Sequence, residues 1–256
     1  MELLKYFFTN KAYLPEGLPG KLFSPLHIVV AIILTITVPT LAILSRKLDK
    51  KKLRTILIVL WVFLVIYEFA KMTWESVTNP HGFEVTGILP LYLCSIFMYV
   101  MPFVLFTKED GFLYKMGCSY LCTYNLVGGL VNFVYPANVL NNYPCYTFAG
   151  MHTLIYHGSM VYVALTLMFT GKYKLTNIKE ALYGFIPLFI VSIPANIINF
   201  IFNCSYMFFR GGYIFDPIYN AMPEVCYILL VYLAYLLIPF VFYGPVYLYK
   251  KKRSTK

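Results

Sequence analysis

Seven apolar segments, each close to the length of a membrane-spanning helix, constrain this chain more than any other feature. They lie at approximately 24–45, 55–76, 88–107, 113–135, 149–170, 180–203 and 223–248. A helix needs about 20 mainly apolar residues to cross a hydrocarbon core about 30 Å thick. Because lipid cannot satisfy an open sheet edge, the segments predict an all-α fold, a polytopic transmembrane bundle with seven spans. Residues 1–256 are expected to form a single integral membrane domain, since no repeat or soluble domain is visible.

The distribution of charge predicts the orientation of these spans. Only 12% of the residues are charged, whereas a soluble domain is about a quarter charged. The formal net charge is +10, but the basic residues form short clusters between apolar segments, which argues against nucleic-acid binding. With seven spans, sixteen of the 21 Lys and Arg residues fall on one side. The positive-inside bias then places the N-terminus outside and the C-terminus in the cytoplasm of a multi-pass protein of the cell membrane.

The six cysteines do not follow a metal-binding pattern. None is part of a CxxC motif, and only Cys118 and Cys122 share a helical face by spacing. We therefore expect no metal, and the absence of a phosphate-binding loop predicts no nucleotide cofactor. Cys145 and Cys204 both lie in connections expected outside, so spacing leaves open whether they form a disulfide.

Several polar residues are expected at similar depth in the outer half of the bilayer. Cys94 lies about six residues and His157 about eight residues from the outer ends of their spans, roughly 9 and 12 Å at the helical rise. Glu68, Asn125 and Asn196 fall within a comparable distance of the outer ends of theirs. Intramembrane ionisable residues are costly and usually face a bundle interior or a wet cavity. These positions therefore predict where a site would form.

The second span also carries an ionisable face. Glu68, Lys71 and Glu75 recur at i, i+3 and i+7, which places them on one side of a helix. Two interpretations remain open. Glu68 and Lys71 can be a structural ion pair between helices, or the face can be a proton- or ligand-linked polar path. His152, nearer the outer end of its span, is expected at the membrane interface.

Cys94 and His157 together suggest a second kind of site. A lone buried cysteine usually packs and does not react. A histidine at matching depth could accept its proton, and a Cys/His pair is the minimal machinery for acyl transfer through a thioester. Asn196, Asn199 and Asn203 have an alternative role as hydrogen-bonding contacts between helices.

Four motifs resemble one family of membrane proteins. They are LPLYLC at 89–94, the glycines and proline at 128, 129 and 136, IYHG at 155–158, and NCSYMFFR at 203–210. Together they resemble the YwaF-like family of bacterial integral membrane proteins. That family is similar to a eukaryotic transmembrane acyltransferase that installs polyunsaturated chains on ether phospholipids with a cysteine. The resemblance spans the second to the seventh segment in the same order.

The resemblance implies roles for particular residues. The family cysteine falls on Cys94 and its histidine on His157, and the family's Asn and aromatic positions fall on Asn203 and Tyr206. Bacterial members often read LPLHLC, whereas this chain has Tyr92 in place of that histidine. Tyrosine donates hydrogen bonds but is a poor base near neutral pH. If the missing histidine is the proton acceptor of the family, catalysis here depends on His157 alone or is absent.

The sequence thus predicts an acyltransferase or transacylase acting on membrane lipid. Cys94 is the expected nucleophile and His157 the expected base, and oxyanion or substrate-positioning contacts are expected from Tyr92, Asn125, Asn203 and Tyr206. The alternative is a non-enzymatic seven-helix transporter or ligand-binding protein that uses Glu68, Lys71 and Glu75. Membrane lipids are the expected partners, with no role for nucleic acid.

Overall fold

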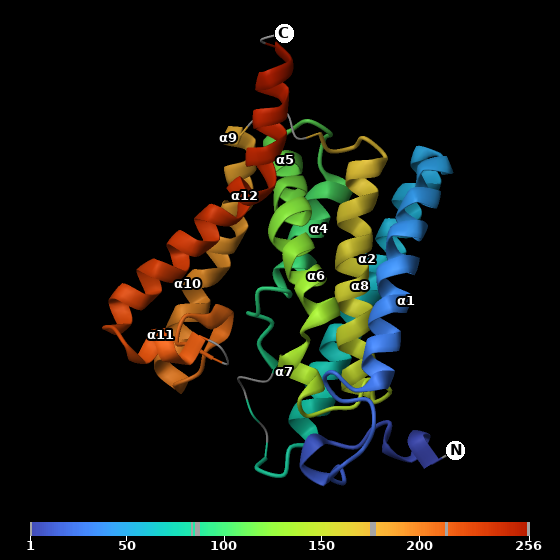
Figure 1. Cartoon of the computed structure of the whole chain (residues 1–256), viewed down its shortest axis with the longest axis vertical. Coiled ribbons are helices and arrows are strands. Elements are labelled where there is room, and N and C mark those ends of the chain that lie inside the picture. The colour runs from blue at the N-terminus through green and yellow to red at the C-terminus, as the bar shows by residue number, and fades with distance from the viewer. Residues whose placement is uncertain (1, 83, 85–87, 175–177, 213–214, 255–256) are drawn as a thin grey trace. The chain divides into compact units, whose positions relative to one another are not determined.

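The computed structural model describes residues 2–82, 84, 88–174, 178–212 and 215–254, and in this part of the chain the regular structure is helical, without a strand. The chain folds into two compact units (Figure 1). Unit 1 comprises residues 1–89 and 126–170, and unit 2 comprises residues 90–125 and 171–256. The end of the expected cytoplasmic tail, Thr255 and Lys256, lies outside the described residues, as do residues 83, 213 and 214 of the expected outer connections.

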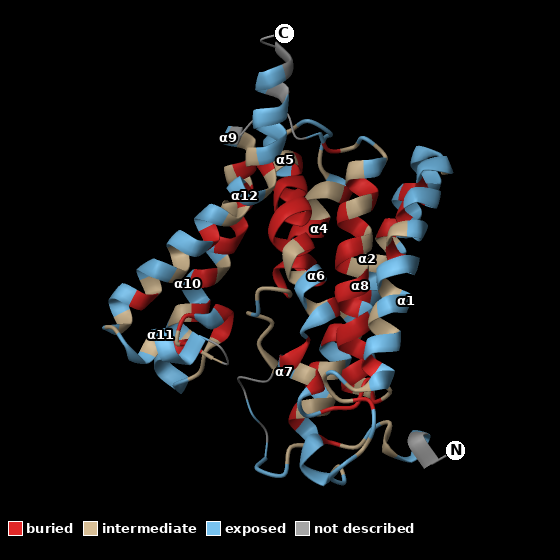
Figure 2. Cartoon of the chain, in the orientation of Figure 1, coloured by how far each residue is buried: buried red, intermediate tan, exposed pale blue. Residues whose placement is uncertain are grey.

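Unit 1 is built around α8 (Phe148–Phe169), which packs against α1 (Pro25–Leu44), α2 (Lys50–Val77) and α6 (Leu126–Val134). The short helix α7 (Ala137–Leu140) and 3-10 turns at Glu2–Tyr6, Lys11–Tyr13 and Ser45–Lys47 complete it. Figure 2 shows that buried residues follow α8, whereas much of α1 is exposed. The central helix of this unit is therefore the one that can carry buried polar side chains.

The long helices of unit 1 begin where a side chain caps the first turn. The side-chain oxygens of Ser24, Asp49 and Thr147 accept hydrogen bonds from backbone N–H groups at the starts of α1, α2 and α8. Such caps satisfy donors that the first helical turn leaves without a partner. Helix starts in this unit are thus encoded locally.

A glycine allows α6 and α8 to approach closely. A Cβ atom placed on Gly129 would lie 2.6 Å from Val161 Cγ2 and 3.0 Å from the His157 carbonyl oxygen. At the neighbouring Gly128, the nearest atom would be 3.7 Å away. Small residues at helix crossings let backbones pack tightly in membranes. Gly129 therefore brings α6 against the turn of α8 that carries His157.

The N-terminal segment folds onto one end of unit 1. The Phe148 N–H donates to the Phe7 carbonyl oxygen at 2.8 Å, and Trp74 Nε1 donates to the Phe8 carbonyl oxygen at 3.2 Å. Asn10 Nδ2 donates to Thr78 Oγ1 at 3.0 Å. These contacts join the segment to the end of α2 and the beginning of α8.

Unit 2 contains the remaining helices. They are α4 (Ile96–Phe106), α5 (Phe112–Tyr120), α9 (Ile178–Ala181), α10 (Phe185–Phe202), α11 (Asp216–Asn220) and α12 (Glu224–Ser254), with the short elements η4 (Leu121–Asn125), η5 (Leu182–Gly184) and η6 (Tyr206–Phe208). The element η4 is one turn of π-helix that continues α5 along the chain. Such turns are frequent at functional sites.

The third apolar segment is the one whose helix differs most from the prediction. We expected a helix over 88–107, but α4 begins only at Ile96, and residues 89–95 are not helical. Pro90 lacks an N–H donor and disfavours helical geometry at the residue before it, which explains a break in this stretch. Cys94 is consequently not two turns inside a helix but lies just before the first turn of α4.

The structure supports a membrane protein by the length and composition of its helices. Within the described part of the chain, four ranges are long and apolar enough to cross a membrane: Pro25–Lys47, Lys50–Val77, Lys179–Phe202 and Glu224–Tyr249. They correspond to the first, second, sixth and seventh predicted segments. The other three segments contain α4, the run from α5 through η4 to α6, and α8, in which His152, Thr153 and His157 are buried.

Candidate functional site

The Cys94 thiol lies on a non-helical turn that leads into α4. Cys94 is half-buried and the neighbouring Ser95 is completely buried. The turn closes where the Ser95 N–H donates to the Tyr92 carbonyl oxygen at 3.0 Å. A helix N-terminus carries partial positive charge, which stabilises a nearby anion. The position before α4 therefore suits a thiol that must become a thiolate to react.

Two tyrosine hydroxyls compensate for the missing helical hydrogen bonds of this turn. Tyr120 Oη donates to the Leu93 carbonyl oxygen at 2.8 Å, and Tyr99 Oη donates to the Pro90 carbonyl oxygen at 3.1 Å. At membrane depth, non-helical backbone is tolerated only where it is buried in protein or lines a wet cavity. The hydrogen bond at Leu93 fixes the peptide immediately before Cys94.

All four predicted positioning residues have defined surroundings in unit 2. The rings of Tyr92 and Tyr206 lie 4.6 Å apart between centroids, so these two residues are brought together beside the Cys94 turn. Asn125 is buried at the end of η4, where its Nδ2 donates to the Leu121 carbonyl oxygen at 3.4 Å. Asn203 is exposed, and its Oδ1 accepts a hydrogen bond from Arg210 at 2.9 Å.

The predicted base, His157, is buried on α8 in unit 1. Its Nδ1 lies 2.7 Å from the Thr153 carbonyl oxygen and 3.3 Å from Thr153 Oγ1. A carbonyl oxygen only accepts hydrogen bonds, so Nδ1 carries the proton in the neutral ring. This assignment leaves Nε2 as the nitrogen with a lone pair. Thr153 therefore selects the tautomer in which Nε2 is the nitrogen that can accept a proton.

Cys94 and His157 belong to different compact units. Each residue has its own surroundings: Cys94 lies on the turn of Tyr92, whose ring contacts Tyr206, in unit 2, and His157 contacts Thr153 in unit 1. The pairing of thiol and imidazole accordingly stays a prediction.

The ionisable face of α2 contains a partner that the sequence reasoning missed. His152, expected at the interface, is 6% exposed, and its Nε2 lies 2.9 Å from Glu68 Oε2. Glu68 itself is 5% exposed, so a carboxylate and an imidazole meet in a buried contact between α2 and α8. Glu68 also interacts electrostatically with Lys71 and His157. The need of a buried carboxylate for a cationic or donor partner was the signal that could have identified His152.

Lys71 and Glu75 form the second part of this face. Lys71 Nζ lies 2.5 Å from Glu75 Oε2, with both side chains partly exposed. Tyr143 Oη donates to Glu75 Oε1 at 3.4 Å. Lys71 and Glu75 thus lie on one face of α2, and the side chains along this face become more buried from Glu75 towards Glu68.

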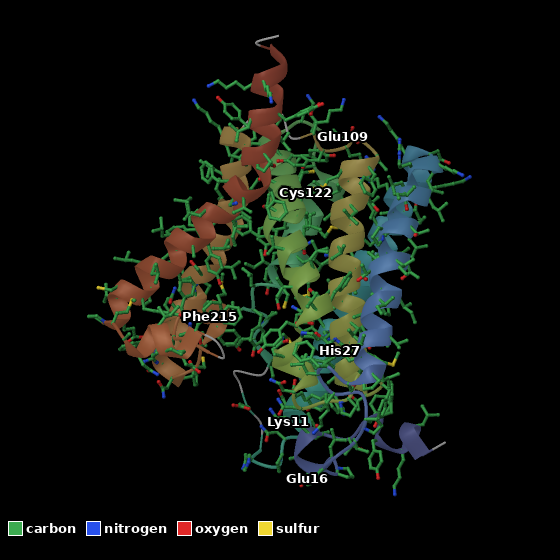
Figure 3. All side chains as sticks on the ribbon, viewed as in Figure 1. Lys11, Glu16, His27, Glu109, Cys122 and Phe215 are labelled. Carbon is green, nitrogen blue, oxygen red and sulfur yellow. The ribbon has the colours of Figure 1, made fainter. Side chains whose placement is uncertain are left out.

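The cysteines outside the turn have other surroundings. Cys145 is buried and is not in a disulfide, so the alternative of a Cys145–Cys204 bond is absent from the structure. Burial raises the pKa of the Cys145 thiol. Cys118 and Cys122 are buried in α5 and η4, and Figure 3 labels Cys122. Among the described residues, no group of three or more His, Cys, Asp or Glu side chains is placed to hold a metal ion.

Comparison with known families decides what kind of protein carries this site. The model of the TMEM164 family matches residues 22–243, which include segments of both units and both Cys94 and His157. The chain belongs to the TMEM164 family. Neither a curated protein nor a solved structure matches the sequence. Family membership and the four long apolar helices together identify this TMEM164-family chain as an integral membrane protein.

Proposed function

We propose that this chain is a membrane-embedded acyltransferase or transacylase that acts on phospholipid or other lipid acyl chains through a thioester at Cys94. One observation carries the proposal: the half-buried thiol lies on a non-helical turn at a helix N-terminus, next to a peptide held by the Tyr120 hydroxyl. The resemblance of the LPLYLC and IYHG motifs to the YwaF-like family, and through it to a cysteine acyltransferase, points to the same residue.

The reaction consists of two ester exchanges. In the first, Cys94 Sγ attacks the carbonyl carbon of a lipid ester, the S–C bond forms, and the ester C–O bond breaks. His157 Nε2 takes the thiol proton and returns it to the leaving alcohol oxygen. In the second, an acceptor hydroxyl gives its proton to His157 and attacks the thioester, which releases the Cys94 thiolate, and that thiolate recovers a proton from His157. Atoms and charges balance without a metal or nucleotide.

The transition state needs donors to the developing oxyanion. Tyr92 and Tyr206 are the strongest candidates because their rings lie beside the Cys94 turn. Asn125 and Asn203 stay candidates through the Nδ2 donors of their amides; Asn125 Nδ2 already donates to the Leu121 carbonyl oxygen, whereas in Asn203 it is the acceptor Oδ1 that bonds to Arg210. These assignments are part of the proposal.

We also propose the finer membrane topology. Residues 1–256 form one integral domain with seven spans, N-terminus outside and C-terminus cytoplasmic, in the cell membrane. The basic clusters alternate with the apolar segments as this orientation requires. In it, Cys94 and His157 both belong to the outer half of the bilayer, so the substrate would be a lipid of the outer leaflet.

The function is tested by acyl exchange in proteoliposomes with purified variants. Cys94→Ala should abolish exchange and leave folding nearly unchanged, because Ala is small and apolar. His157→Gln should reduce the rate by roughly 10²- to 10⁴-fold, the usual contribution of a general base. Cys118→Ala is the matched control, since that thiol is buried in α5, and its removal should leave the exchange rate nearly unchanged. Wild-type activity in Cys94→Ala would end the thioester mechanism.

A second function is favoured by the buried Glu68–His152 contact. Ionisable pairs inside a membrane bundle mark ion or proton paths, and this one continues through Lys71 and Glu75 along α2. A transporter or ligand-binding protein would lose flux or binding in Glu68→Gln and keep it in Cys94→Ala. The acyltransferase predicts the opposite for Cys94→Ala, so the same two variants separate the functions.

A further inference from the structure

The segment that follows α10 in unit 2 has an unusual backbone. Asn203, Met207 and Phe208 all have positive φ angles, of 50°, 55° and 57°. Asparagine adopts this left-handed region readily, but Met and Phe do so rarely because their Cβ atoms approach the backbone. Such conformations persist only where the surroundings hold them, and they gather at functional sites.

The side chain of Asn199 holds this segment. Asn199 is 1% exposed, and both ends of its amide bind the backbone of one residue, Tyr206. Asn199 Oδ1 accepts from the Tyr206 N–H at 2.6 Å, and Nδ2 donates to the Tyr206 carbonyl oxygen at 3.0 Å. The sequence reasoning assigned Asn199 to contacts between helices. Its partner is instead a loop residue seven positions along the chain, so the amide fixes the two peptide groups on either side of the Tyr206 Cα.

Further hydrogen bonds hold the same segment from both ends. Arg210 Nη1 donates to the Asn199 carbonyl oxygen at 3.0 Å, and Arg210 Nε lies 2.7 Å from Glu224 Oε1. Hydrogen bonding to Tyr219 raises the pKa of Arg210, which keeps this residue a cation. Tyr235 Oη donates to the Met207 carbonyl oxygen at 2.7 Å. The backbone on each side of Tyr206 is therefore fixed.

The fixed residue touches the Cys94 turn. Tyr206 is 2% exposed, and its ring lies 4.6 Å from the ring of Tyr92. The carbonyl oxygen of Tyr92 accepts the hydrogen bond that closes the turn around Cys94. A continuous set of contacts thus runs from the Asn199 amide through Tyr206 and Tyr92 to the turn that carries Cys94.

We propose that Asn199 is a positioning residue that orients the Cys94 thiol by clamping Tyr206 against Tyr92. The inference about thiol orientation stands on geometry within unit 2. Its consequence for turnover rests on the proposed acyltransferase function. Asn199 touches no reacting atom in this scheme, and its effect passes through the two tyrosine rings.

The experiment uses Asn199→Asp in the full-length protein reconstituted in lipid. Aspartate keeps the acceptor towards the Tyr206 N–H and loses the donor towards the Tyr206 carbonyl oxygen, with almost no change in volume. The readout is the rate at which N-ethylmaleimide alkylates Cys94, followed by mass spectrometry of its peptide. We expect alkylation of the loosened turn to become several-fold faster. For acyl exchange, we expect kcat to fall by ~10-fold with little change in KM, as misplaced reacting groups cause.

Asn196→Asp is the matched control. Asn196 lies on the same helix, one turn earlier, and bonds the Ser192 carbonyl oxygen and Tyr232 Oη, with no contact to the Tyr206 backbone among the hydrogen bonds of the described residues. It should leave Cys94 alkylation at the wild-type rate. Equal acceleration in both variants would show general loosening of α10 and would overturn the inference.

Two further outcomes separate this inference from the proposed function. An unchanged Cys94 alkylation rate in folded Asn199→Asp overturns the positioning role, even if the wild type transfers acyl chains. Faster alkylation in a protein that never transfers acyl chains supports the positioning role and removes the proposed function. If Asn199→Asp does not fold, Tyr206→Ala tests the same connection, because it removes the ring and keeps the backbone bonds. An unchanged alkylation rate in that variant would also refute the inference.

Discussion

Removal of His152 should destabilise unit 1 strongly, because it removes the imidazole that contacts the buried Glu68 carboxylate. The two side chains are 7% and 6% exposed, and their ion-pair atoms lie 2.9 Å apart. Breaking such a buried pair by removing one member usually costs ~3–5 kcal/mol. At ~2–4 °C per kcal/mol for a protein of this size, His152→Leu should lower the melting temperature by ~6–20 °C.

The double variant His152→Leu with Glu68→Met should recover most of that loss. Replacing both members of a buried pair by apolar groups of similar volume is often neutral or stabilising. Lys71→Met is the matched control, because the Lys71–Glu75 pair is partly exposed and such pairs contribute only ~0–1 kcal/mol. The assay is thermal unfolding, followed by circular dichroism, of the wild type, His152→Leu, Glu68→Met, the double variant and Lys71→Met in one detergent.

Two results would refute this reasoning. One is a melting temperature of His152→Leu within a degree or two of that of the Lys71→Met control. The other is a decrease in the melting temperature of the double variant that equals the sum of the decreases in the two single variants. The first result would mean that the buried carboxylate has another sufficient partner. The second would mean that Glu68 and His152 are not energetically linked.

Two further predictions test the packing of unit 1 and the topology. In thermal unfolding, Gly129→Ala should destabilise the protein by ~1–3 kcal/mol, because the added methyl group clashes with Val161 on α8. Gly128→Ala should be neutral or slightly stabilising in the same measurement. Equal effects of the two substitutions would contradict the close crossing of α6 and α8. A membrane-impermeant maleimide added outside intact cells should label exposed Cys226 and not Cys145, whose raised pKa and burial keep the thiol protonated and shielded near pH 7.5. Cys226 that reacts only after permeabilisation would reverse the proposed orientation.

The sequence predicted many of the individual residues of the candidate site, but it did not predict which of them contact one another. Depth along each segment selected Cys94, His157 and Glu68, because ionisable and thiol groups are conspicuous against an apolar background. It did not select His152 or Asn199. Their partners are Glu68 and Tyr206, and neither pairing follows from the helical periodicity of its own segment.

The sequence by itself determined the helical class, the apolar segments and the local helix starts. Apolar runs in lipid must satisfy their own backbone hydrogen bonds, and the caps at Ser24, Asp49 and Thr147 act within three residues. The i, i+4 spacing likewise predicted that Lys71 and Glu75 share a face, where the structure pairs them.

Only the tertiary structure decided where the third helix begins and how the polar groups pair. The turn at 89–95 is possible because Tyr120 and Tyr99 supply donors to its carbonyl oxygens, and Tyr120 reaches Leu93 across 27 positions of sequence. The Asn199 clamp and the Glu68–His152 contact likewise depend on which segments the fold brings side by side. Hydropathy reports how much a residue avoids water, whereas a hydrogen bond depends on the position of its partner, and folding alone sets that position.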